Sequence, residues 1–463
     1  MTEASLTRYY QRYANARLIS LLIVSLGCFL LPLAISASLI AVPAISDELN
    51  ANAVLVSWIP ATFVLSSLIA QLPGGRLADL YGRKRIFVVG FALFAFGGVL
   101  GAIAPNIEFL LFSRVIQGIG GAIGTSSGMA ILSSIYQGGG RGAALGWMTS
   151  SIYMGMTAGP LVGGWLVDEF GWRAVFWAPV PISLLAVIGA STKIRGEWNS
   201  ADRHLVDWIG VSLSAVALGA LFFGSTHLIE LSGLLLAVTG VGVMYLFLRR
   251  CSKAAYPLIR IDMITQNKTF LRSILAALFM YSSQYGIVVL MVLYLQYNRG
   301  MTPTEAGQIM MLQAVMMTIC APIAGRLSDL WGSRVLATVG CLIIATGLGI
   351  LVQVNDRMPL VVIAGSMMAI GLGHGLFSTP NNSTAIGTVA AAKLGIATAT
   401  LNLARQCGQL LGTAVLSLLI AIFFDGRSIT PQGYKDFQSV AVWALSISLA
   451  FSLMAAWFSS RKG

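Results

Sequence analysis

The chain has 463 residues, of which 10% are charged and 57% are apolar, and its mean hydropathy is +0.81. An ordinary soluble domain carries roughly 25% charged residues, so a soluble enzyme and a disordered protein are excluded. The net charge of +12 would favour a nucleic-acid partner only in a soluble chain, whereas in a membrane protein it indicates basic cytoplasmic loops. The five cysteines are scattered without a CxxC pair, so we expect neither disulfides nor a metal site.

Apolar runs long enough to cross a bilayer follow one another along the chain. A spanning helix needs roughly 20 apolar residues, and the first run is too long for a cleaved signal peptide. Fourteen such runs begin near Leu18, Val54, Ile86, Phe109, Ala143, Trp172, Leu205, Leu231, Phe270, Glu305, Val335, Pro359, Leu394 and Gln438. They do not alternate as barrel strands do. The sequence therefore predicts an all-α, multi-pass membrane protein with fourteen transmembrane helices.

The basic residues orient these spans. With both termini in the cytoplasm, 22 of the 29 Lys and Arg fall in cytoplasmic segments, 5 in external loops and 2 within spans. This bias follows the positive-inside rule and accounts for the positive charge without nucleic acid. We expect both termini to be cytoplasmic and the protein to lie in the inner (cytoplasmic) membrane of a bacterial cell.

One loop sequence occurs twice. Residues 75–84, GRLADLYGRK, recur as residues 325–334, GRLSDLWGSR, with six of ten positions identical. The first copy follows the second predicted span and the other follows the tenth, so the last six spans repeat the first six. We predict an N-terminal six-helix bundle (1–200), an inserted two-helix linker (201–265) and a C-terminal six-helix bundle (266–463). Such internal repeats are typical of secondary transporters.

These motifs resemble those of the major facilitator superfamily, and the six-two-six layout is similar to its fourteen-helix drug:proton antiporter branch. The loop signature is one match, residues 114–118 (RVIQG) resemble the fourth-helix arginine motif, and residues 155–164 (GMTAGPLVGG) fit the antiporter motif GxxxGPxxGG. The resemblance implies a proton-coupled secondary transporter that exports drug-like molecules or metabolites. Its two bundles would rock around a central site, which gives alternating access.

The same resemblance sets expectations for partners. It implies a monomer, not an enzyme, whose partners are a small-molecule substrate, a proton gradient and membrane lipids. The chain has no GxxxxGK[ST] loop, so ATP does not drive the cycle and we expect no cofactor.

The resemblance also assigns residue roles. In the family, the loop signature latches the two halves in the outward-facing state, and the alternative is a plain basic loop that sets topology. The latch residues here are Gly75, Asp79, Arg83 and Asp329. Glycines four residues apart share one helix face and allow another helix to approach closely, while proline bends a helix. The antiporter motif supplies Gly155, Gly159, Pro160, Gly163 and Gly164.

Two arginines fall inside predicted spans, Arg114 in the fourth and Arg405 in the thirteenth. An intramembrane arginine normally faces a cavity or a partner, and snorkelling to the surface is the alternative. The antiporter branch usually carries an Asp in the first helix, where this chain has Ala34, and none of its 17 acidic residues is predicted at mid-membrane. Two arginines without a carboxylate suit an anionic, zwitterionic or acceptor-rich neutral substrate.

His374, between Gly373 and Gly375, is the titratable alternative at membrane depth. Because histidine titrates near neutral pH, we hypothesise that His374, with Arg114, contributes to proton coupling; hydrogen bonding in helix packing is the other interpretation. The repeat, taken at an offset of 250, places Gln284 opposite Ala34. The candidate substrate site consists of Trp58, Arg114, Gln117, Tyr153, Tyr281, Gln284, Tyr285, Gln313, Asn381, Asn382, Arg405 and Gln409.

Two other functions compete with a proton-coupled exporter. The replacement of the first-helix acid by Ala34 favours a facilitative or anion-exchanging transporter. A membrane sensor or scaffold that kept the fold without transporting is the second alternative, and it predicts that Arg114→Ala leaves function intact.

Overall fold

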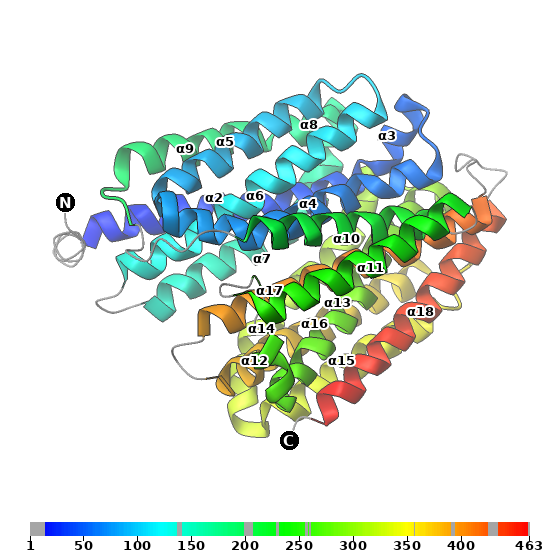
Figure 1. Cartoon of the computed structure of the whole chain (residues 1–463). Coiled ribbons are helices and arrows are strands. Elements are labelled where there is room, and N and C mark those ends of the chain that lie inside the picture. The colour runs from blue at the N-terminus through cyan, green and yellow to red at the C-terminus, as the bar shows by residue number, and fades with distance from the viewer. Residues whose placement is uncertain are drawn as a thin grey trace. The chain divides into compact units, whose positions relative to one another are not determined.

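The computed structural model describes residues 14–136, 141–198, 207–227, 231–254, 258, 261–355, 357–389, 394–424 and 434–461. Within these residues the regular secondary structure is helical throughout, without a strand (Figure 1). The predicted all-α fold class is therefore confirmed for the described part of the chain.

The chain divides into two compact units, Met1–Ala44 with Thr62–Trp208, and Ile45–Ala61 with Ile209–Gly463. The N-terminal part of the chain contains α2 (Ala14–Ile40), α3 (Val42–Leu49), α4 (Ala53–Tyr81), α5 (Arg83–Ala102), α6 (Ile107–Ile135), α7 (Arg141–Phe170), α8 (Arg173–Trp177) and α9 (Pro179–Lys193). The first residues of α4, up to Ala61, belong to the second unit. The predicted division at 200 and 265 follows the sequence repeat and stays a prediction.

The remaining helices all belong to the second unit. They are α10 (Trp208–Thr226), whose first residue closes the first unit, α11 (Leu231–Lys253), α12 (Ile261–Gln266), α13 (Lys268–Leu293), the π-helix η1 (Tyr294–Asn298), α14 (Pro303–Trp331), α15 (Ser333–Leu351), α16 (Leu360–Gly387), α17 (Leu394–Phe424) and α18 (Tyr434–Ser460).

Thirteen helices of the described part are long and apolar enough to cross a membrane. They coincide with thirteen of the fourteen predicted spans. The remaining prediction, near Ala143, falls on α7, a helix of 30 residues. At about 1.5 Å per residue its length is ample, but its Gly, Ser and Thr residues make it less apolar than the others. Those residues serve a packing role, described below.

Local sequence signals explain where several helices begin. The side chain of Asn106 accepts the backbone N–H of Phe109 at 2.9 Å and so caps α6. Asn267 caps α13 in the same way through Phe270. Thr302 and Glu305 form a reciprocal capping box at the start of α14. Each cap supplies an acceptor for an N–H group that has no intrahelical partner.

The helix pairing repeats between the units, as the sequence repeat predicts. In the first unit α2 packs on α6, α7 and α9, and α5 packs on α6 and α9. In the second unit α13 packs on α16, α17 and α18, and α15 packs on α16 and α18. The helices α13 to α18 thus take the places of α2 to α9.

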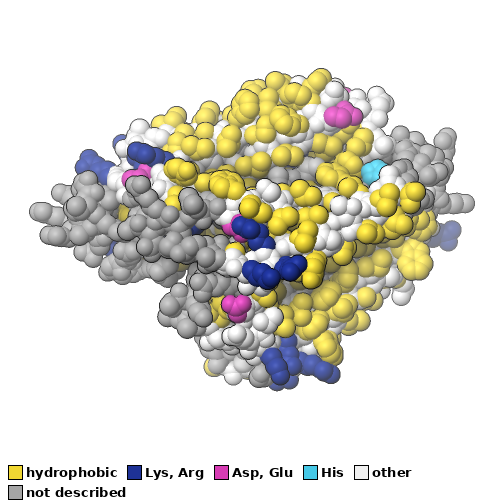
Figure 2. Space-filling view, viewed as in Figure 1, with side chains coloured by type: hydrophobic (Ala, Val, Ile, Leu, Met, Phe, Trp, Pro, Cys, Tyr) yellow, Lys and Arg dark blue, Asp and Glu magenta, His cyan; other side chains and the backbone are white. Residues whose placement is uncertain are grey.

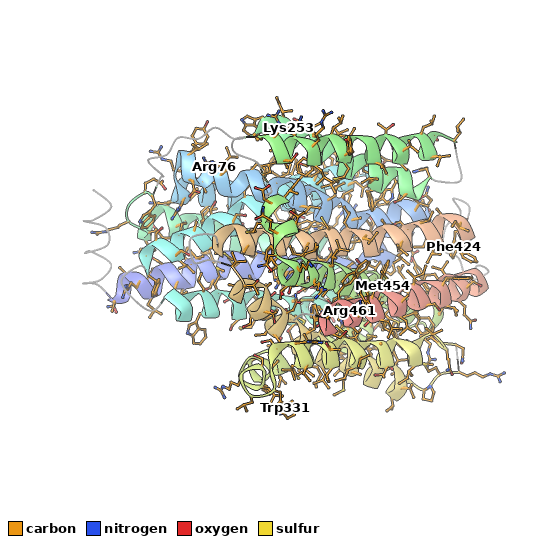
Figure 3. All side chains as sticks on the ribbon, turned by 60° about the horizontal axis from the view of Figure 1, so that its bottom comes forward. Arg76, Lys253, Trp331, Phe424, Met454 and Arg461 are labelled. Carbon is orange, nitrogen blue, oxygen red and sulfur yellow. The ribbon has the colours of Figure 1, made fainter. Side chains whose placement is uncertain are left out.

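The outer surface of the helices is apolar, as contact with lipid requires. Exposed large side chains include Leu22, Phe96 and Trp165 in the first unit and Val241 and Trp443 in the second. Figure 2 shows hydrophobic side chains over most of the described surface in that view. Charged and aromatic side chains mark helix ends; Figure 3 labels, among others, Lys253 at the end of α11 and Trp331 at the end of α14.

Candidate functional site

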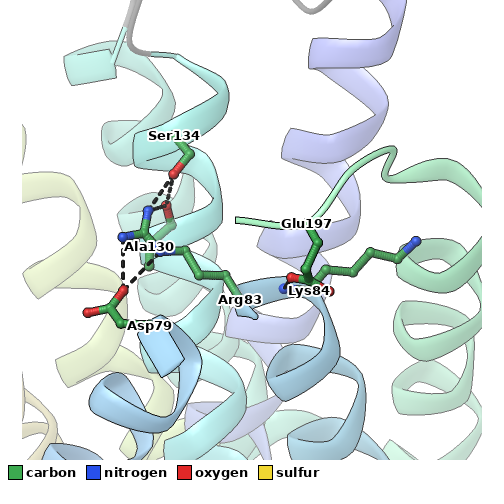
Figure 4. Close-up of polar contacts among 6 residues, drawn as sticks. All are labelled: Asp79, Arg83, Lys84, Ala130, Ser134 and Glu197. Atoms are coloured by element: carbon green, nitrogen blue, oxygen red, sulfur yellow. Dashed lines mark hydrogen bonds and ion pairs between the residues drawn. The ribbon is translucent and has the colours of Figure 1, made fainter. Parts of the chain in front are cut away.

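The first copy of the loop signature lies between α4 and α5, and its arginine is held by α6 (Figure 4). Arg83 donates from Nε and Nη2 to Oδ1 of Asp79, at 3.1 and 2.9 Å. Its Nη1 donates to the carbonyl oxygen of Ala130 and to the hydroxyl of Ser134, near the end of α6. Gly82 has a φ of +106°, which glycine adopts without steric cost. The predicted latch residues Asp79 and Arg83 are thus in direct contact.

An acid that sequence reasoning missed binds the same loop. The carboxylate of Glu197, which follows α9, accepts the backbone N–H groups of Lys84 at 2.8 Å and Arg85 at 3.2 Å (Figure 4). Nζ of Lys84 donates to the carbonyl oxygens of Ser191 and Ile194 at the end of α9. Both contacts place a charge where the helix dipole favours it. We call these five residues the Glu197 clasp.

The other two latch residues are less informative. A Cβ built at Gly75 would have no neighbour within 4 Å, so no close contact requires glycine there. The side chain of Asp329 lies outside the described residues. The second signature copy ends α14 at Trp331 and continues through Gly332, whose φ is +84°. The two copies therefore share the same break, a glycine with positive φ between two helices.

The antiporter motif forms a close seam between α7 and α2. A Cβ at Gly163 would lie 2.6 Å from Cα of Ala37, and Cβ atoms at Gly155 and Gly159 would strike the α2 backbone or side chains of the same face. Pro160 and Gly164 are buried on the same helix. Small residues let the two backbones approach, so the glycines of this motif are required by packing.

A second seam, which sequence reasoning missed, joins α17 to α13. Cβ atoms at Gly408 and Gly412 would strike the carbonyl oxygens of Leu278 and Ser282. The signal was present as a pair of glycines four residues apart. These contacts match those of Gly155 with Phe29 and of Gly159 with Leu33 in the first unit.

The matched seams correct one prediction about the repeat. Phe29 corresponds to Leu278 and Leu33 to Ser282, so the offset between α2 and α13 is 249 rather than 250. Ser283, and not Gln284, therefore occupies the position equivalent to Ala34. The one-residue difference matters because the neighbouring residues of a helix point in different directions.

Arg114 is completely enclosed within the first unit, with an exposed fraction of 0%. It donates from Nη1 to Oε1 of Gln117 at 2.8 Å and from Nη2 to the hydroxyl of Ser38 at 3.0 Å. Its guanidinium carbon lies 4.4 Å from the ring centroid of Phe63 and 5.6 Å from that of Phe176. The predicted pair Arg114 and Gln117 is therefore in contact, and aromatic rings cover the charge.

The second unit contains a different polar group, formed by α13, α16 and α17. Arg405 donates from Nη1 to Oδ1 of Asn402 at 3.3 Å and from Nη2 to Oδ1 of Asn382. Its guanidinium carbon lies 5.5 Å from the ring centroid of Tyr281. The ring of His374 meets the same tyrosine at a centroid distance of 5.0 Å and an interplanar angle of 89°. We call Tyr281, His374, Asn382, Asn402 and Arg405 the Arg405 cluster.

The glycines beside His374 explain its direction. A Cβ at Gly373 would lie 2.7 Å from Cγ1 of Ile344 on α15, and one at Gly375 would lie 2.9 Å from Cβ of Cys320 on α14. With its two neighbours packed against α15 and α14, His374 is left to face Tyr281 on α13. Its exposed fraction is 1%, and its Nδ1 has no hydrogen-bond partner in the described part of the chain.

The other predicted residues are dispersed. Trp58 packs against Phe223, with centroids 4.7 Å apart, and also touches His227. Tyr153 is half-buried on α7, Gln409 is half-buried on α17, and the side chain of Tyr285 lies outside the described residues. The buried members are Gln284, Gln313 and Asn381, the last of which donates to the carbonyl oxygen of Ser273 at 3.2 Å.

Acidic residues of the described long helices lie close to the helix ends. Glu108 and Glu305 fall in first turns, and Asp79 and Asp168 lie two residues before the ends of α4 and α7. The position that would carry the first-helix acid is Ala34, which is buried on α2. Within the described residues, the middle of each span is thus without a carboxylate, as the sequence predicts.

Comparison with known proteins identifies the family. A profile of the Major Facilitator Superfamily matches residues 24–248 and 273–462. Riboflavin transporter RibZ of Clostridioides difficile (strain 630) is 28% identical over 432 residues, which is 92% of this chain and 92% of that protein. Multidrug resistance protein Stp of Mycobacterium tuberculosis (strain CDC 1551 / Oshkosh) is 28% identical over 420 residues, 89% of this chain and 77% of that protein.

A solved structure shares the fold. A bacterial homolog of the human lysosomal transporter Spinster, solved in an inward-facing and unoccupied conformation, superposes with a TM-score of 0.70 at 17% identity. The alignment covers 96% of this chain and 97% of that one. The family predicted from the loop signature and the antiporter motif is thereby confirmed: the chain belongs to the major facilitator superfamily.

Proposed function

We propose that the chain is a secondary transporter that exports small organic molecules, either drug-like compounds or metabolites, across a bacterial cytoplasmic membrane. The observation that carries the proposal is the glycine seam of α7, in which the motif GxxxGPxxGG packs on α2. The similarity of the chain to proteins named as a riboflavin transporter and a multidrug resistance protein supports the same function. One relative is named for riboflavin transport and the other for multidrug resistance, and the proposed substrate class follows these two names.

The proposed topology has fourteen spans with both termini in the cytoplasm. The protein is proposed to act as a monomer. The topology adds α7 to the thirteen apolar helices, since its length of 30 residues suffices and its polarity is explained by the seam. The clustering of Lys and Arg near the signature loops supports the orientation.

Alternating access is the proposed mechanism, with two repeated bundles that move relative to each other. Arg83 and Asp79 are suited to a latch because their ion pair is partly exposed, at 25% and 33% of the side-chain surface. Exposed ion pairs contribute little net stability, so such a contact can break and re-form during each cycle.

A proton gradient is the proposed energy source, with His374 as the group that carries the proton. His374 is suited to this role because it lies near the middle of α16 and its Nδ1 has no partner in the described part of the chain. A second candidate function, facilitative or anion-exchanging transport, is favoured by the two arginines at depth and by Ala34 in place of an acid.

Proteoliposomes test the proposal. Purified protein should move a dye against its concentration gradient when a pH gradient is imposed, and an uncoupler should abolish this movement. His374→Gln should remove the dependence on the pH gradient while the protein still folds, since glutamine keeps a polar side chain of similar reach. Full pH-gradient-driven transport by the His374→Gln protein would contradict the role of His374. Transport that is indifferent to the uncoupler would favour the second candidate.

A further inference from the structure

We infer that the Arg405 cluster binds the anionic group of the transported molecule, a small organic carboxylate with a planar part, and that Arg405 is its anion-binding residue. The inference rests on the proposed transport function and adds a substrate class and a site to it. Three observations carry it: an uncompensated charge, an unused donor and an adjacent aromatic ring.

Within the described part of the chain, the guanidinium of Arg405 forms no ion pair with a carboxylate. Arginine stays protonated in proteins, and the two oxygens that accept from its guanidinium belong to the neutral amides of Asn382 and Asn402. The three helices that build the cluster, α13, α16 and α17, contain no Asp or Glu. An anion that enters the cluster therefore meets a cation without a competing carboxylate on these helices.

The cluster lies within the membrane-spanning helices. At about 1.5 Å per residue, Arg405 is roughly 16 Å from the start of α17, and Tyr281 and His374 are each about 20 Å from the starts of α13 and α16. A charge at such a depth is costly and marks a substrate or ion pathway in most membrane proteins. A bound carboxylate would offset that cost.

The donors of Arg405 are suited to a carboxylate. Nε is buried and has no hydrogen-bond partner among the described residues, and the bonds from Nη1 and Nη2 go to amide oxygens that a carboxylate can displace. A guanidinium binds a carboxylate through two parallel hydrogen bonds, which are roughly twice as strong as bonds between neutral groups. Nδ1 of His374 also has no hydrogen-bond partner in the described part of the chain and donates when it carries the proton.

The ring of Tyr281 supplies a surface for the rest of the molecule. It is half-buried and lies between Arg405 and His374, at 5.5 Å from the guanidinium carbon and 5.0 Å from the imidazole centroid. Planar groups pack on aromatic faces and edges. Arg405 itself is half-buried, whereas Arg114 is fully enclosed. Of these two arginines, Arg405 is therefore the one that a ligand can reach in this structure.

Two dyes on one scaffold test the inference. Fluorescein is an anion at neutral pH, and rhodamine 123 is a cation on the same tricyclic ring system. Binding of each to the purified full-length protein is measured by fluorescence anisotropy in detergent. We expect tighter binding of fluorescein, and a fall of at least about tenfold in its affinity in Arg405→Gln, the size expected when one partner of a hydrogen-bonded charge pair is lost.

Three further variants separate charge from folding. Arg405→Lys keeps the charge without the planar fork and should lose less affinity for fluorescein than Arg405→Gln. Asn382→Asp places a carboxylate beside Arg405 and should weaken fluorescein binding without removing the arginine. Arg249→Gln removes the same charge at an exposed position of α11 and should bind like the wild type. Thermal melting of each variant identifies any that fail to fold.

The outcomes distinguish this inference from the proposed function. Unchanged fluorescein affinity in Arg405→Gln, equal wild-type affinity for both dyes, or binding of neither dye would overturn the inference. If any of these results were found and proteoliposomes still exported rhodamine 123, the proposed transport function would be upheld without the anion site. Arg405-dependent binding of fluorescein without transport of either dye would uphold the anion site while counting against the proposed export.

Discussion

Each unit of the protein holds one arginine at membrane depth, and the two side chains are held in different ways. Arg114 lies between the rings of Phe63 and Phe176 with no exposed surface. Arg405 is half-buried, bonds to two side-chain amides and has an Nε without a partner in the described part of the chain. The enclosed arginine matches a family motif, and the accessible one does not. A motif match therefore does not identify which charge meets a ligand.

The glycine seams of the two units, unlike their arginines, are built in the same way. Gly155 and Gly159 pack on α2 as Gly408 and Gly412 pack on α13, although only the first pair belongs to a GPxxGG motif. The backbone packing is thus repeated, whereas the polar side chains are not. His374 has no counterpart in the first unit, where the corresponding stretch of α6 is rich in glycine. The residues proposed here for substrate and proton are therefore among the side chains that differ between the repeats.

Removal of Arg114 should have the largest effect on stability. Arg114→Ala leaves Gln117 without one of its partners and a cavity between two phenylalanine rings. Buried cavities and unsatisfied polar groups together cost about 2–4 kcal/mol. We expect a clear fall in the thermal midpoint measured in detergent, and a loss of transport with it.

Arg405→Ala is the matched control for that prediction. Its side chain is half-buried, and its hydrogen bonds to described residues go to side-chain amides, so the thermal midpoint of Arg405→Ala should stay close to that of the wild type while fluorescein binding falls. Equal midpoints for Arg114→Ala and the wild type would contradict the structural role of Arg114. Intact function in a well-folded Arg114→Ala protein would support a non-transporting membrane sensor.

A methyl group in the α7 seam should have a smaller effect. In Gly163→Ala the new Cβ would lie 2.6 Å from Cα of Ala37, and overpacking of this kind costs about 1–3 kcal/mol. Gly146→Ala on the same helix is the control, because its Cβ would have no neighbour within 4 Å. Equal thermal midpoints for the two variants would show that α7 and α2 do not require close contact.

The other seam extends the comparison. In Gly412→Ala the new Cβ would lie 3.2 Å from the backbone nitrogen of Gly286 and would strike the carbonyl oxygen of Ser282. If the seams are equivalent, Gly412→Ala should lower the midpoint by an amount similar to that of Gly159→Ala, the matching position on α7. A tolerated Gly412→Ala would mean that only the first unit depends on its glycine face.

Much of the fold could be predicted from the sequence because hydropathy and the repeat are strong signals. The starts of the long helices follow caps and breaks visible in the chain, such as Asn106 and Thr302. The fourteenth span, α7, stays a prediction, because the residues that favour close packing in it also lower its hydropathy. Register within the repeat was one residue out, since Ser283 and Gln284 are adjacent polar residues and the sequence does not show which of them takes the position of Ala34.

The candidate site was harder to predict because it depends on side-chain direction. The sequence grouped Trp58 with Arg405, yet in the structure Trp58 packs on the aromatic rings of α10. It identified His374 and Tyr281 separately, but their contact arises from glycines that bring α16 against α14 and α15. Glu197 was missed because its partners are backbone N–H groups 112 and 113 residues away, and no side-chain pattern marks such a contact.

The Glu197 clasp gives the smallest and last prediction. Glu197→Ala removes the acceptor for two N–H groups in the first turn of α5, and loss of such a cap costs about 0.5–2 kcal/mol. Glu197→Gln keeps a carbonyl acceptor and loses the interaction with the helix dipole and with Arg85, so it should fall between the wild type and Glu197→Ala. Glu169→Ala, an exposed acid at the end of α7, should leave the midpoint unchanged.

The Glu197 clasp also predicts a local change at the start of α5. Glu197 joins the signature loop to the segment after α9, which precedes the inserted helices. Loss of its carboxylate should therefore expose the first backbone N–H groups of α5 to solvent without unfolding the rest of the protein. Hydrogen exchange of the Lys84 and Arg85 amides reports this directly, since both N–H groups bond to the Glu197 carboxylate. Faster exchange at these amides in Glu197→Ala, with protection of α6 unchanged, is the expected result. Unchanged exchange at Lys84 and Arg85 would mean that the carboxylate does not hold the start of α5.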